Sequence, residues 1–527
     1  MKRRIFGLAC ASALLVACGG GPARYPLAPP LTKDPDDQPF SPAPEEYDAP
    51  YEWDGINETI FRPISRFFAV DPAGRAKNVN AYDEVPDSSW FVNRIGKKAM
   101  SVAEMKRGAC DDKVLDPKTA KKGEWIIDQG KPNGANPGFR VNIPGYGKFM
   151  LKTDLAGEPD RATGATAVAS RLYHAIGYFS PCDSVVYFDP SLLTLKPGLT
   201  VTGNGGESKP FDQKALDAVL KAASTRDGLT RMVASKWLPG KTIGPYKYDG
   251  TRDDDPNDVV DHEDRREIRA ARLIAAWTNH FDTREANTMN VFLSQNPKDP
   301  RSPGHVQHYI IDLGDCFGSV WQWKEWTKRL GFAYYVDVPY ILEDFGSLGT
   351  IDRPWDHAQE TGGTFKYFSA RDFDPEYWRS GYPNAAFVKM TEQDGAWFAR
   401  ILARITDDLV EAAVDVGAYT PEDSRYLSET LINRRDAILR RYLARISPIA
   451  EPHLEGDALC GTDLARKTHV VPDDQKAFFA TLYTGPKLAP KWRLAPDAAP
   501  GGNVCVSLPH VAPDGGPRAD DASRYVV

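Results

Sequence analysis

The sequence predicts a mixed α+β protein in which short strands come first and helices dominate the second half. Of its 527 residues, 42% are hydrophobic and 26% are charged, which are the proportions of a globular protein. This length allows roughly three domains of about 150 residues each. Short apolar segments separated by glycine-rich loops lie between residues 123 and 154, whereas amphipathic helices are clear at 392–416 and 421–445. We therefore expect a strand-rich part followed by a larger helical part.

Three short strands are predicted near residue 140. Glu124–Asp128 is the first, Phe139–Ile143 alternates with period two, and Lys148–Lys152 is the third. A helix is expected at 162–176, because its apolar residues recur three and four positions apart, and Gly177 follows where a helix C-cap belongs.

The elements further along the chain follow from the same rules. Strands are expected at 184–188 and 231–238, with a helix at 212–224 between them. Asp261 is expected to cap a helix over 262–279, because acidic residues fill its first turn. Proline and glycine are frequent in residues 452–527, which predicts a strand-poor C-terminal extension.

The N-terminus has the layout of an export signal. Met1–Arg4 is basic, and Ile5–Ala17 is an apolar stretch too short to cross a bilayer as a helix. It ends in the letters LVAC followed by Gly19, which resembles the lipobox of bacterial lipoproteins. That resemblance implies a signal peptide over residues 1–17, acyl chains such as palmitate on Cys18, and the lipid bilayer as a partner. An ordinary secretory signal with an incidental cysteine is the alternative.

The resemblance also predicts where the protein is located. A lipid-anchored protein of the cell envelope is implied, and Gly19 in place of aspartate favours the outer membrane over the inner one. Proline recurs through residues 18–50, which predicts an extended tether between the anchor and the folded body.

Charge and cysteine content narrow the possible functions. The net charge of −7 and the pI near 5.8 argue against nucleic acid as a partner, because binding phosphates needs clustered lysine and arginine. Five cysteines follow Cys18, so at least one is unpaired in an oxidising compartment. Cys460 and Cys505 share the C-terminal segment and are the preferred disulfide pair.

One motif in the second half of the chain contains the candidate catalytic residues. The segment His280–Asn287 reads H-x-D-x-R-x-x-N, and after an apolar strand Tyr309–Gly314 ends in D-x-G. This order resembles the catalytic loop and metal-binding motif of protein kinases and their atypical relatives, including the phosphatidylinositol kinases. Phosphoryl transfer needs a carboxylate beside the attacking hydroxyl, a cation near the phosphate, and oxygen ligands for Mg²⁺. A tight loop facing a second carboxylate at a strand end can supply all three.

The resemblance implies a bilobal, protein-kinase-like fold. Its small strand-rich lobe, with an insert, would occupy residues 121–238, and its larger helical lobe residues 239–451. An N-terminal extension would cover residues 51–120, and the C-terminal extension residues 452–527.

The resemblance also implies a role for each polar residue of the motif. Asp282 would be the proton acceptor and Arg284 the cation near the γ-phosphate. Asn287 and Asp312 would be the Mg²⁺ ligands, and His280 would be the packing histidine of the loop. ATP and Mg²⁺ would be the cofactors.

The strand-rich part would supply the remaining contacts to the nucleotide. Gly130, Gly134 and Gly138 punctuate the first turn, where bare amides can approach phosphates, and Lys152 stands where the phosphate-pairing lysine belongs. In the kinase pattern a helix glutamate holds this lysine, but the corresponding positions here read Ala165–Ala167, and Glu158 is the nearest substitute.

Two hypotheses therefore follow from the sequence. The first is an envelope lipoprotein that transfers phosphoryl groups from a nucleotide with Mg²⁺ to a protein or small molecule. The second is a non-catalytic, pseudokinase-like lipoprotein that binds or scaffolds other molecules. The missing helix glutamate and the scarcity of ATP outside the inner membrane favour the second hypothesis.

Overall fold

The computed structural model describes residues 31–47, 51–70, 73–111, 115–131, 136–155, 157–202, 207–299, 301–318, 324–361, 363–446, 448–472, 478–484, 489–508 and 525–526. It confirms the mixed α+β class, because helices and several separate β-sheets are distributed along the chain.

The largest sheet has seven strands, and the three strands predicted near residue 140 lie side by side within it. They are β1 (Trp125–Gly130), β2 (Gly138–Ile143) and β3 (Gly147–Lys152), with antiparallel pairing. The strand order is β4-β9-β3-β2-β1-β5, with β8 beside β9. The other four strands are β4 (Asp183–Phe188), β5 (Leu193–Leu195), β8 (Thr225–Arg226) and β9 (Leu229–Lys236). Their inward side chains form an apolar core whose buried residues all fall between Trp125 and Ala234.

Small elements complete this strand-rich part. The two-stranded ribbon of β6 (Thr200–Thr202) and β7 (Ser208–Pro210) precedes helix α6 (Gln213–Ala222). Leu216 and Val219 of α6 reach the same core, so the predicted insert packs onto the sheet. Short 3₁₀ turns lie beside this sheet at η2 (Pro117–Thr119) and η3 (Pro190–Leu192). Two others, η7 (Pro354–His357) and η9 (Pro500–Gly502), lie in later parts of the chain.

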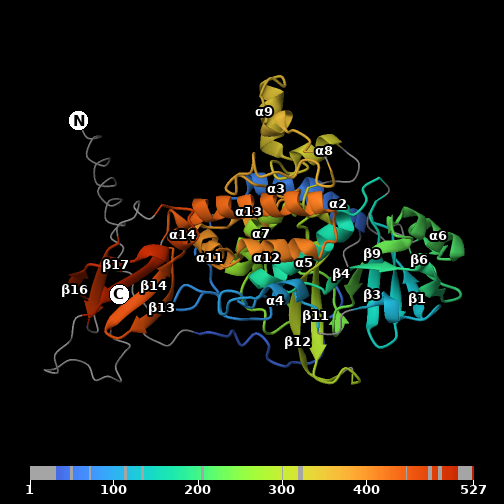
Figure 1. The fold of residues 1–527 in the computed structure, drawn as a ribbon, viewed down its shortest axis with the longest axis horizontal. Coiled ribbons are helices and arrows are strands. Elements are labelled where there is room, and N and C mark those ends of the chain that lie inside the picture. The colour runs from blue at the N-terminus through green and yellow to red at the C-terminus, as the bar shows by residue number, and fades with distance from the viewer. Residues whose placement is uncertain are drawn as a thin grey trace, which may run out of the picture.

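A second, larger core is built mainly from helices. Figure 1 shows these helices packed beside the seven-stranded sheet. They are α4 (Val102–Arg107), α5 (Arg161–Ile176), α7 (Arg266–Thr278), α10 (Ala385–Val388), α11 (Glu392–Leu402), α12 (Asp407–Asp415) and α13 (Pro421–Leu443). A three-stranded antiparallel sheet lies against them, formed by β10 (Lys241–Thr242), β11 (Thr288–Ser294) and β12 (Gly304–Ile310).

Two helix predictions need correction. The predicted helix over 262–279 begins only at Arg266, because Arg265 has extended backbone angles and separates α7 from a 3₁₀ turn, η4 (His262–Asp264). The side chain of Asp261 makes no capping hydrogen bond. The predicted helix over 392–416 is two helices, α11 and α12, whereas the helix at 421–445 is confirmed as α13, capped by Thr420.

The sequence predicted a strand-poor C-terminal extension, but the structure contains two β-sheets there. It contains a four-stranded sheet of order β13-β14-β18-β17 and a three-stranded sheet of order β16-β15-β19. These elements are β13 (Ile449–Glu455), β14 (Ala458–Asp463), α14 (Leu464–Lys467), β15 (Ala480–Thr484), β16 (Ala489–Leu494), β17 (Asp497–Ala498), β18 (Asn503–Ser507) and β19 (Tyr525–Val526). The prediction failed because proline and glycine also occur between the strands of short hairpins such as β13–β14 and β15–β16, and because β14 pairs with the distant β18.

The cysteines form two disulfides. Cys460 pairs with Cys505, which confirms the preferred pair, and Cys110 pairs with Cys182, which the sequence did not predict. Cys316 is a buried free thiol.

The first described segment lies against the folded body. Phe40 exchanges backbone hydrogen bonds with Gly304, and Asp36 accepts hydrogen bonds from Ser89. Residues 31–47 are therefore not the free spacer that the predicted tether over 18–50 implies. The signal peptide and Cys18 lie outside the described residues. Among the helices that the structure describes, none is both long and apolar enough to cross a membrane.

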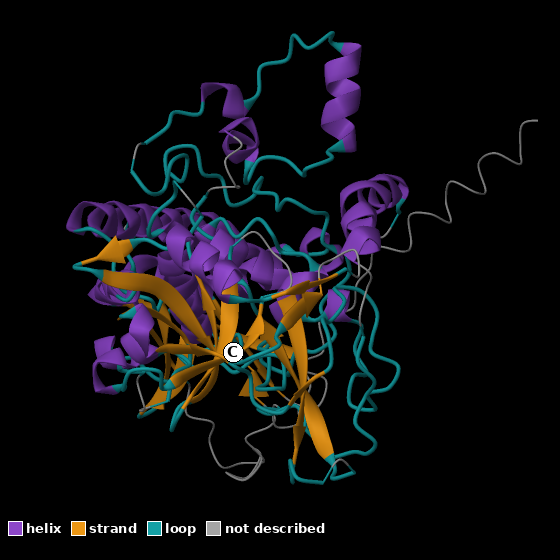
Figure 2. Cartoon of the chain, turned by 90° about the vertical axis from the view of Figure 1, so that its right-hand side faces the viewer, coloured by secondary structure: helices purple, strands orange, loops and turns teal. Residues whose placement is uncertain are grey.

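Two helical segments remain. The chain from Tyr51 to Phe68 is one continuous helical rod made of α2 (Tyr51–Ile56), a π-helical turn η1 (Asn57–Phe61) and α3 (Arg62–Phe68). Helices α8 (Lys324–Arg329) and α9 (Val338–Gly346) project above α3 in Figure 1. Figure 2, turned about the vertical axis, also shows a helix standing clear of the body at that height.

Candidate functional site

Lys152 and Asp312 meet in the structure, although they come from different sheets. Lys152 ends β3, Asp312 follows β12, and the Nζ of Lys152 lies 2.7 Å from the Oδ1 of Asp312. The charge of Lys152 holds the pKa of Asp312 well below its usual range. Burial alone would lower the pKa of Lys152, but Asp312 raises it, so both groups are ionised at neutral pH. The Asp312 side chain is 45% exposed, so a ligand can reach the pair.

The β11–β12 pairing brings Asn287 to the same place. Thr288 pairs with Ile310 in the antiparallel ladder, and the backbone N–H of Ile311 donates to the carbonyl oxygen of Asn287 at 2.9 Å. Residues opposite each other in such a ladder have Cα atoms about 5 Å apart. Asn287 therefore lies beside Ile311, and Asp312 is the next residue along.

A turn changes the direction of the chain directly after this ladder. Asp312 has a positive φ of 55°, which aspartate tolerates better than most residues, and it starts the 3₁₀ turn η6 (Leu313–Asp315). Gly314 of this turn lies against α5, where an added Cβ would stand 3.2 Å from Thr166 Oγ1. The D-x-G segment is thus fixed on the first half of α5.

Internal hydrogen bonds hold the loop from His280 to Asn287. The Nδ2 of Asn287 donates to the backbone oxygen of Asp282 at 2.7 Å, which leaves the amide oxygen of Asn287 available to a ligand. His280 is buried with its Nδ1 2.9 Å from the hydroxyl of Tyr173, and burial lowers the pKa of His280 to about 4. A neutral His280 therefore packs inside the loop, where the sequence analysis placed it.

Arg284 contacts the proposed proton acceptor. Its Nε lies 3.3 Å from Asp282 Oδ1, and its NH1 lies 3.6 Å from Asp54 on α2. Burial raises the pKa of Asp282, and the nearby Arg284 opposes that shift. Arg284 is therefore held between two carboxylates, whereas Lys152 is the cation on Asp312.

The structure adds Asp315 to this cluster. The carboxyl groups of Asp282 and Asp315 lie close enough to affect each other's pKa. Burial raises the pKa of Asp315, and the negative charges of Asp282 and Asp312 add to the shift. The protonated form of Asp315 is therefore favoured.

The structure also adds Lys131, which follows β1. Its Nζ donates to the backbone oxygen of Asn136 at 2.8 Å. Burial lowers the pKa of Lys131 to about 8, the charge of Lys152 lowers it further, and Asp312 and Asp315 oppose the shift. Two lysines, one after β1 and one at the end of β3, therefore face the aspartates, which is the charge pattern that a phosphate group requires.

The predicted glycine loop has a simpler structural explanation at two of its three positions. A Cβ on Gly138 would stand 2.3 Å from the backbone oxygen of Leu151 in the neighbouring strand, and a Cβ on Gly130 would stand 2.4 Å from Val201. Both glycines are required by packing, whatever the loop binds. Gly134 lies outside the described residues.

The helix glutamate of the kinase pattern has no counterpart facing Lys152 on α5. Ala165, Thr166 and Ala167 are all buried, and Glu158, the substitute suggested by the sequence, pairs instead with Arg161 at 2.9 Å and with Lys366. Asp312 itself takes the role of holding Lys152.

The donor atoms of this cluster suit Mg²⁺. Asp312 and Asn287 offer a carboxylate and an amide oxygen, whereas Asp282 Oδ1 lies 3.3 Å from the Nε of Arg284. Among the residues that the structure describes, three candidate ligand atoms converge within 4.8 Å only at His453, Glu455 and Cys460, and that sulfur is in a disulfide. The aspartates thus form no closed cage. Mg²⁺ needs none, because it usually keeps several waters and shares one or two carboxylates with substrate phosphates.

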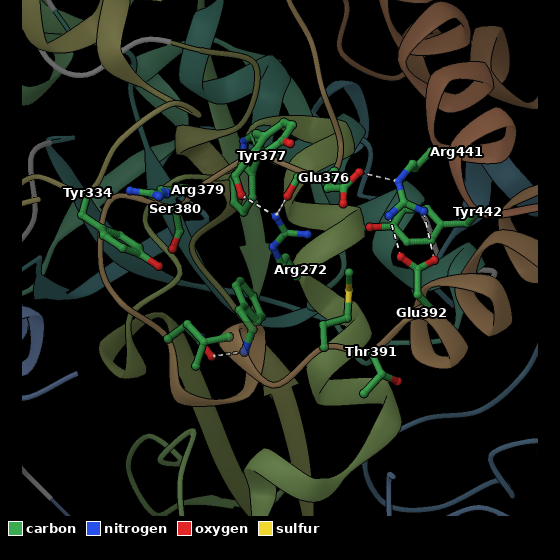
Figure 3. A pocket seen from close by; sticks show the side chains of 15 residues that line it. Arg272, Tyr334, Glu376, Tyr377, Arg379, Ser380, Thr391, Glu392, Arg441 and Tyr442 are labelled. Carbon is green, nitrogen blue, oxygen red and sulfur yellow. Dashed lines mark hydrogen bonds and ion pairs between the residues drawn. The ribbon is translucent and has the colours of Figure 1, made fainter. Parts of the chain in front are cut away.

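A cavity of about 360 Å³ lies beside residues 376–380, next to Gly381, which contacts this loop. Gly381 N–H donates to the backbone oxygen of Phe281 at 2.8 Å, and the neighbouring Ser380 lines the cavity. Figure 3 shows Arg272 and Arg441 inside it. Arg272 donates to backbone oxygens of residues 375, 376 and 378, and Arg441 pairs with Glu376 and Glu392. These cations are satisfied by the protein, so the cavity adds no charge to the candidate site.

No family model, curated protein or solved structure matches the chain.

Proposed function

We propose that the chain is a cell-envelope lipoprotein whose body is a bilobal, protein-kinase-like phosphotransferase that uses Mg²⁺ and a nucleotide. The observation that supports this most is the contact between Lys152 and Asp312, with Asn287 at the same end of the β11–β12 ladder. Two distant segments that resemble kinase motifs thus approach each other as phosphoryl transfer requires.

Each residue then has a defined task. Lys152 and Lys131 bind phosphate oxygens, Asp312 and the amide oxygen of Asn287 hold the metal, and Asp282 receives the proton of the attacking hydroxyl. Bound Mg²⁺ supplies charge neutralisation at the phosphates. Arg284 favours the ionised form of Asp282, since its guanidinium opposes the effect of burial on the pKa of that carboxyl. A proton shared by Asp282 and Asp315 would relieve the repulsion between the two carboxyl groups.

The location is part of the proposal. Cleavage before Cys18 and acylation of that residue would anchor the chain, with the outer membrane preferred. A nucleotide or another phosphoryl donor must then reach the envelope. Mass spectrometry of the chain purified from membranes tests the anchor, because each acyl chain adds a defined mass to the N-terminal peptide.

Nucleotide binding is tested by thermal unfolding of the full chain. A ligand that binds only the native state raises the melting temperature as its concentration exceeds the dissociation constant. We expect ATP or GTP with Mg²⁺ to raise the melting temperature and EDTA to abolish the effect. Absence of any shift across nucleotides and divalent metals contradicts the proposal.

A second candidate function is a non-catalytic, pseudokinase-like binding or scaffold module. The absence of an acidic side chain among Ala165, Thr166 and Ala167 favours it, because Lys152 then depends on the metal-binding aspartate for its position. This candidate predicts that a nucleotide raises the melting temperature while no phosphoryl transfer or nucleotide hydrolysis is detected. The two measurements together separate the candidates.

A further inference from the structure

The helical rod formed by α2, η1 and α3 has its polar and apolar faces reversed relative to a normal surface helix. Its charged residues Asp54, Glu58, Arg62 and Arg66 recur every four positions and face the protein. Its apolar residues recur three or four positions apart and face solvent. The exposed ones are Trp53, Ile56, Ile60, Phe61, Ile64, Phe67 and Phe68.

Side chains on the inner face of the rod contact one another and the loop of the candidate site. Arg62 lies 3.1 Å from Glu58 and 2.8 Å from Glu285, and Asp54 lies 3.6 Å from Arg284. Because these pairs fix which side of the rod faces inward, the apolar side is held outward by the fold. Soluble proteins rarely leave a contiguous apolar patch of this kind uncovered.

Helix α9 extends the same surface. It contains no buried residue, and it packs against α3. Ile341, Leu342, Phe345 and Leu348 are all exposed, with Phe345 at 83% and Leu348 at 90%. Figure 1 shows α9 projecting from the body, so its tip is a convex finger and not a groove.

The tip of the finger carries no charged residue. Residues 345–351 read FGSLGTI and carry no charge, and the two acids of α9, Glu343 and Asp344, both pair with Arg353 at 2.7 and 2.8 Å. A protruding apolar tip with paired charges suits insertion into lipid, where unpaired charge is costly. A protein partner would more commonly meet a flatter surface with a polar rim.

We propose that the outward faces of α2–α3 and α9 dock onto a lipid bilayer. This inference rests on the proposed lipoprotein anchor in one respect: an acyl chain on Cys18 would keep the chain near the membrane, and a second contact makes such anchoring stable and gives it an orientation. The buried ion pairs would then connect the membrane-facing rod directly to Arg284 and Glu285 of the candidate site.

The test uses the mature chain with Cys18→Ala, so that binding cannot come from the acyl group. Co-sedimentation with vesicles of phosphatidylethanolamine and phosphatidylglycerol measures the partition coefficient. We expect binding by this chain, and a loss of roughly tenfold or more in Phe345→Glu/Leu348→Glu and in Ile60→Glu/Ile64→Glu, because each glutamate removes an apolar side chain from lipid. The matched control is Val259→Glu/Leu454→Glu, two exposed apolar residues on other parts of the surface, which should bind unchanged.

Several outcomes overturn the inference. Absence of vesicle binding contradicts it. Equal vesicle binding by all variants also contradicts it, provided that their melting temperatures match that of the parent chain. A dimer in sedimentation without lipid that becomes monomeric in the same variants would mean that a second copy covers the surface. Nucleotide binding, measured separately by thermal shift, can fail while vesicle binding persists, so this inference and the proposed function fail independently.

Discussion

The Nζ of Lys152 lies 2.7 Å from the Oδ1 of Asp312, although the two residues are 160 positions apart. Lys152 belongs to the seven-stranded sheet, whose apolar core is separate from the one that surrounds the β12–η6 segment. The ion pair therefore joins two independently packed parts of the molecule at a point open to solvent. A ligand that draws Lys152 onto a phosphate would change this contact directly.

We predict that Asp312→Asn weakens nucleotide–Mg²⁺ binding by at least about tenfold, because it removes both a metal ligand and the partner of Lys152. The concentration dependence of the thermal shift measures the affinity. Asp128→Asn is the matched control, because Asp128 pairs with Arg140 on the same sheet at the same 2.7 Å. Equal affinities in the two variants would remove Asp312 from the site.

We predict that Asp282→Asn retains nucleotide binding but lowers turnover by roughly 10²–10⁴-fold, as expected when a general base is lost. Nucleotide hydrolysis or transfer to an acceptor measures the turnover. Asp261→Asn serves as the control, since Asp261 is half exposed on the far side of α7 from the loop. An unchanged rate in Asp282→Asn would show that Asp282 is not the proton acceptor.

The parts of the site that could be predicted from the sequence are those set by local pattern and motif order. The period of two predicted β1–β3, and the two motifs predicted that Lys152, Asn287 and Asp312 belong together. Asp315 and Lys131 could not be placed in this way. Asp315 depends on the left-handed backbone at Asp312, and Lys131 depends on its contact with the backbone oxygen of Asn136.

Two further sequence predictions were wrong because contacts between distant residues determine the structure there. In the C-terminal extension β14 pairs with β18 across more than a third of the segment, and a proline- and glycine-rich composition does not reveal such pairing. Helix α7 begins late because Arg265 is extended, with its guanidinium over the ring of Trp90. Tertiary contacts override the local preference for helix at that position.

We predict that Gly138→Ala destabilises the protein by about 1–3 kcal/mol with or without nucleotide, because the added Cβ would overlap the Leu151 carbonyl. Urea unfolding measures the change. Gly74→Ala is the control, since no atom lies within 4 Å of the added Cβ there. A stable Gly138→Ala variant that has lost only nucleotide binding would instead support the phosphate-binding role predicted for this glycine.

We predict that Glu58 makes stability fall as the pH rises. Burial raises the pKa of Glu58 from about 4.5 to about 8, and Arg62 opposes this shift only in part. The folded state therefore holds a proton that the unfolded state has released, so the stability from this group is complete below pH 4.5 and is lost as the pH approaches 8. Glu58→Gln removes this dependence, and we expect the difference between the two chains to change by roughly 3–5 kcal/mol between pH 5 and pH 8.5. Parallel pH profiles in urea unfolding would contradict this prediction.

The disulfide between Cys110 and Cys182 encloses 72 positions of the chain, which include β1–β3 and α5. Strand β3, which carries Lys152, and its neighbour β2 thus lie within one covalent loop, whereas β9 on the other side of β3 lies outside it. Closing a loop of this length stabilises a protein by about 4 kcal/mol in the chain-entropy model, because it restricts the unfolded state.

We predict a loss of this size in Cys110→Ser/Cys182→Ser, together with weaker nucleotide binding. The control Cys460→Ser/Cys505→Ser should leave nucleotide binding intact, because that disulfide lies within the C-terminal sheet. Urea unfolding and nucleotide titration measure the two effects. Equal nucleotide affinities in the two double variants would show that the Lys152 site keeps its geometry without the covalent loop, since the strands and α5 would then be held by packing alone.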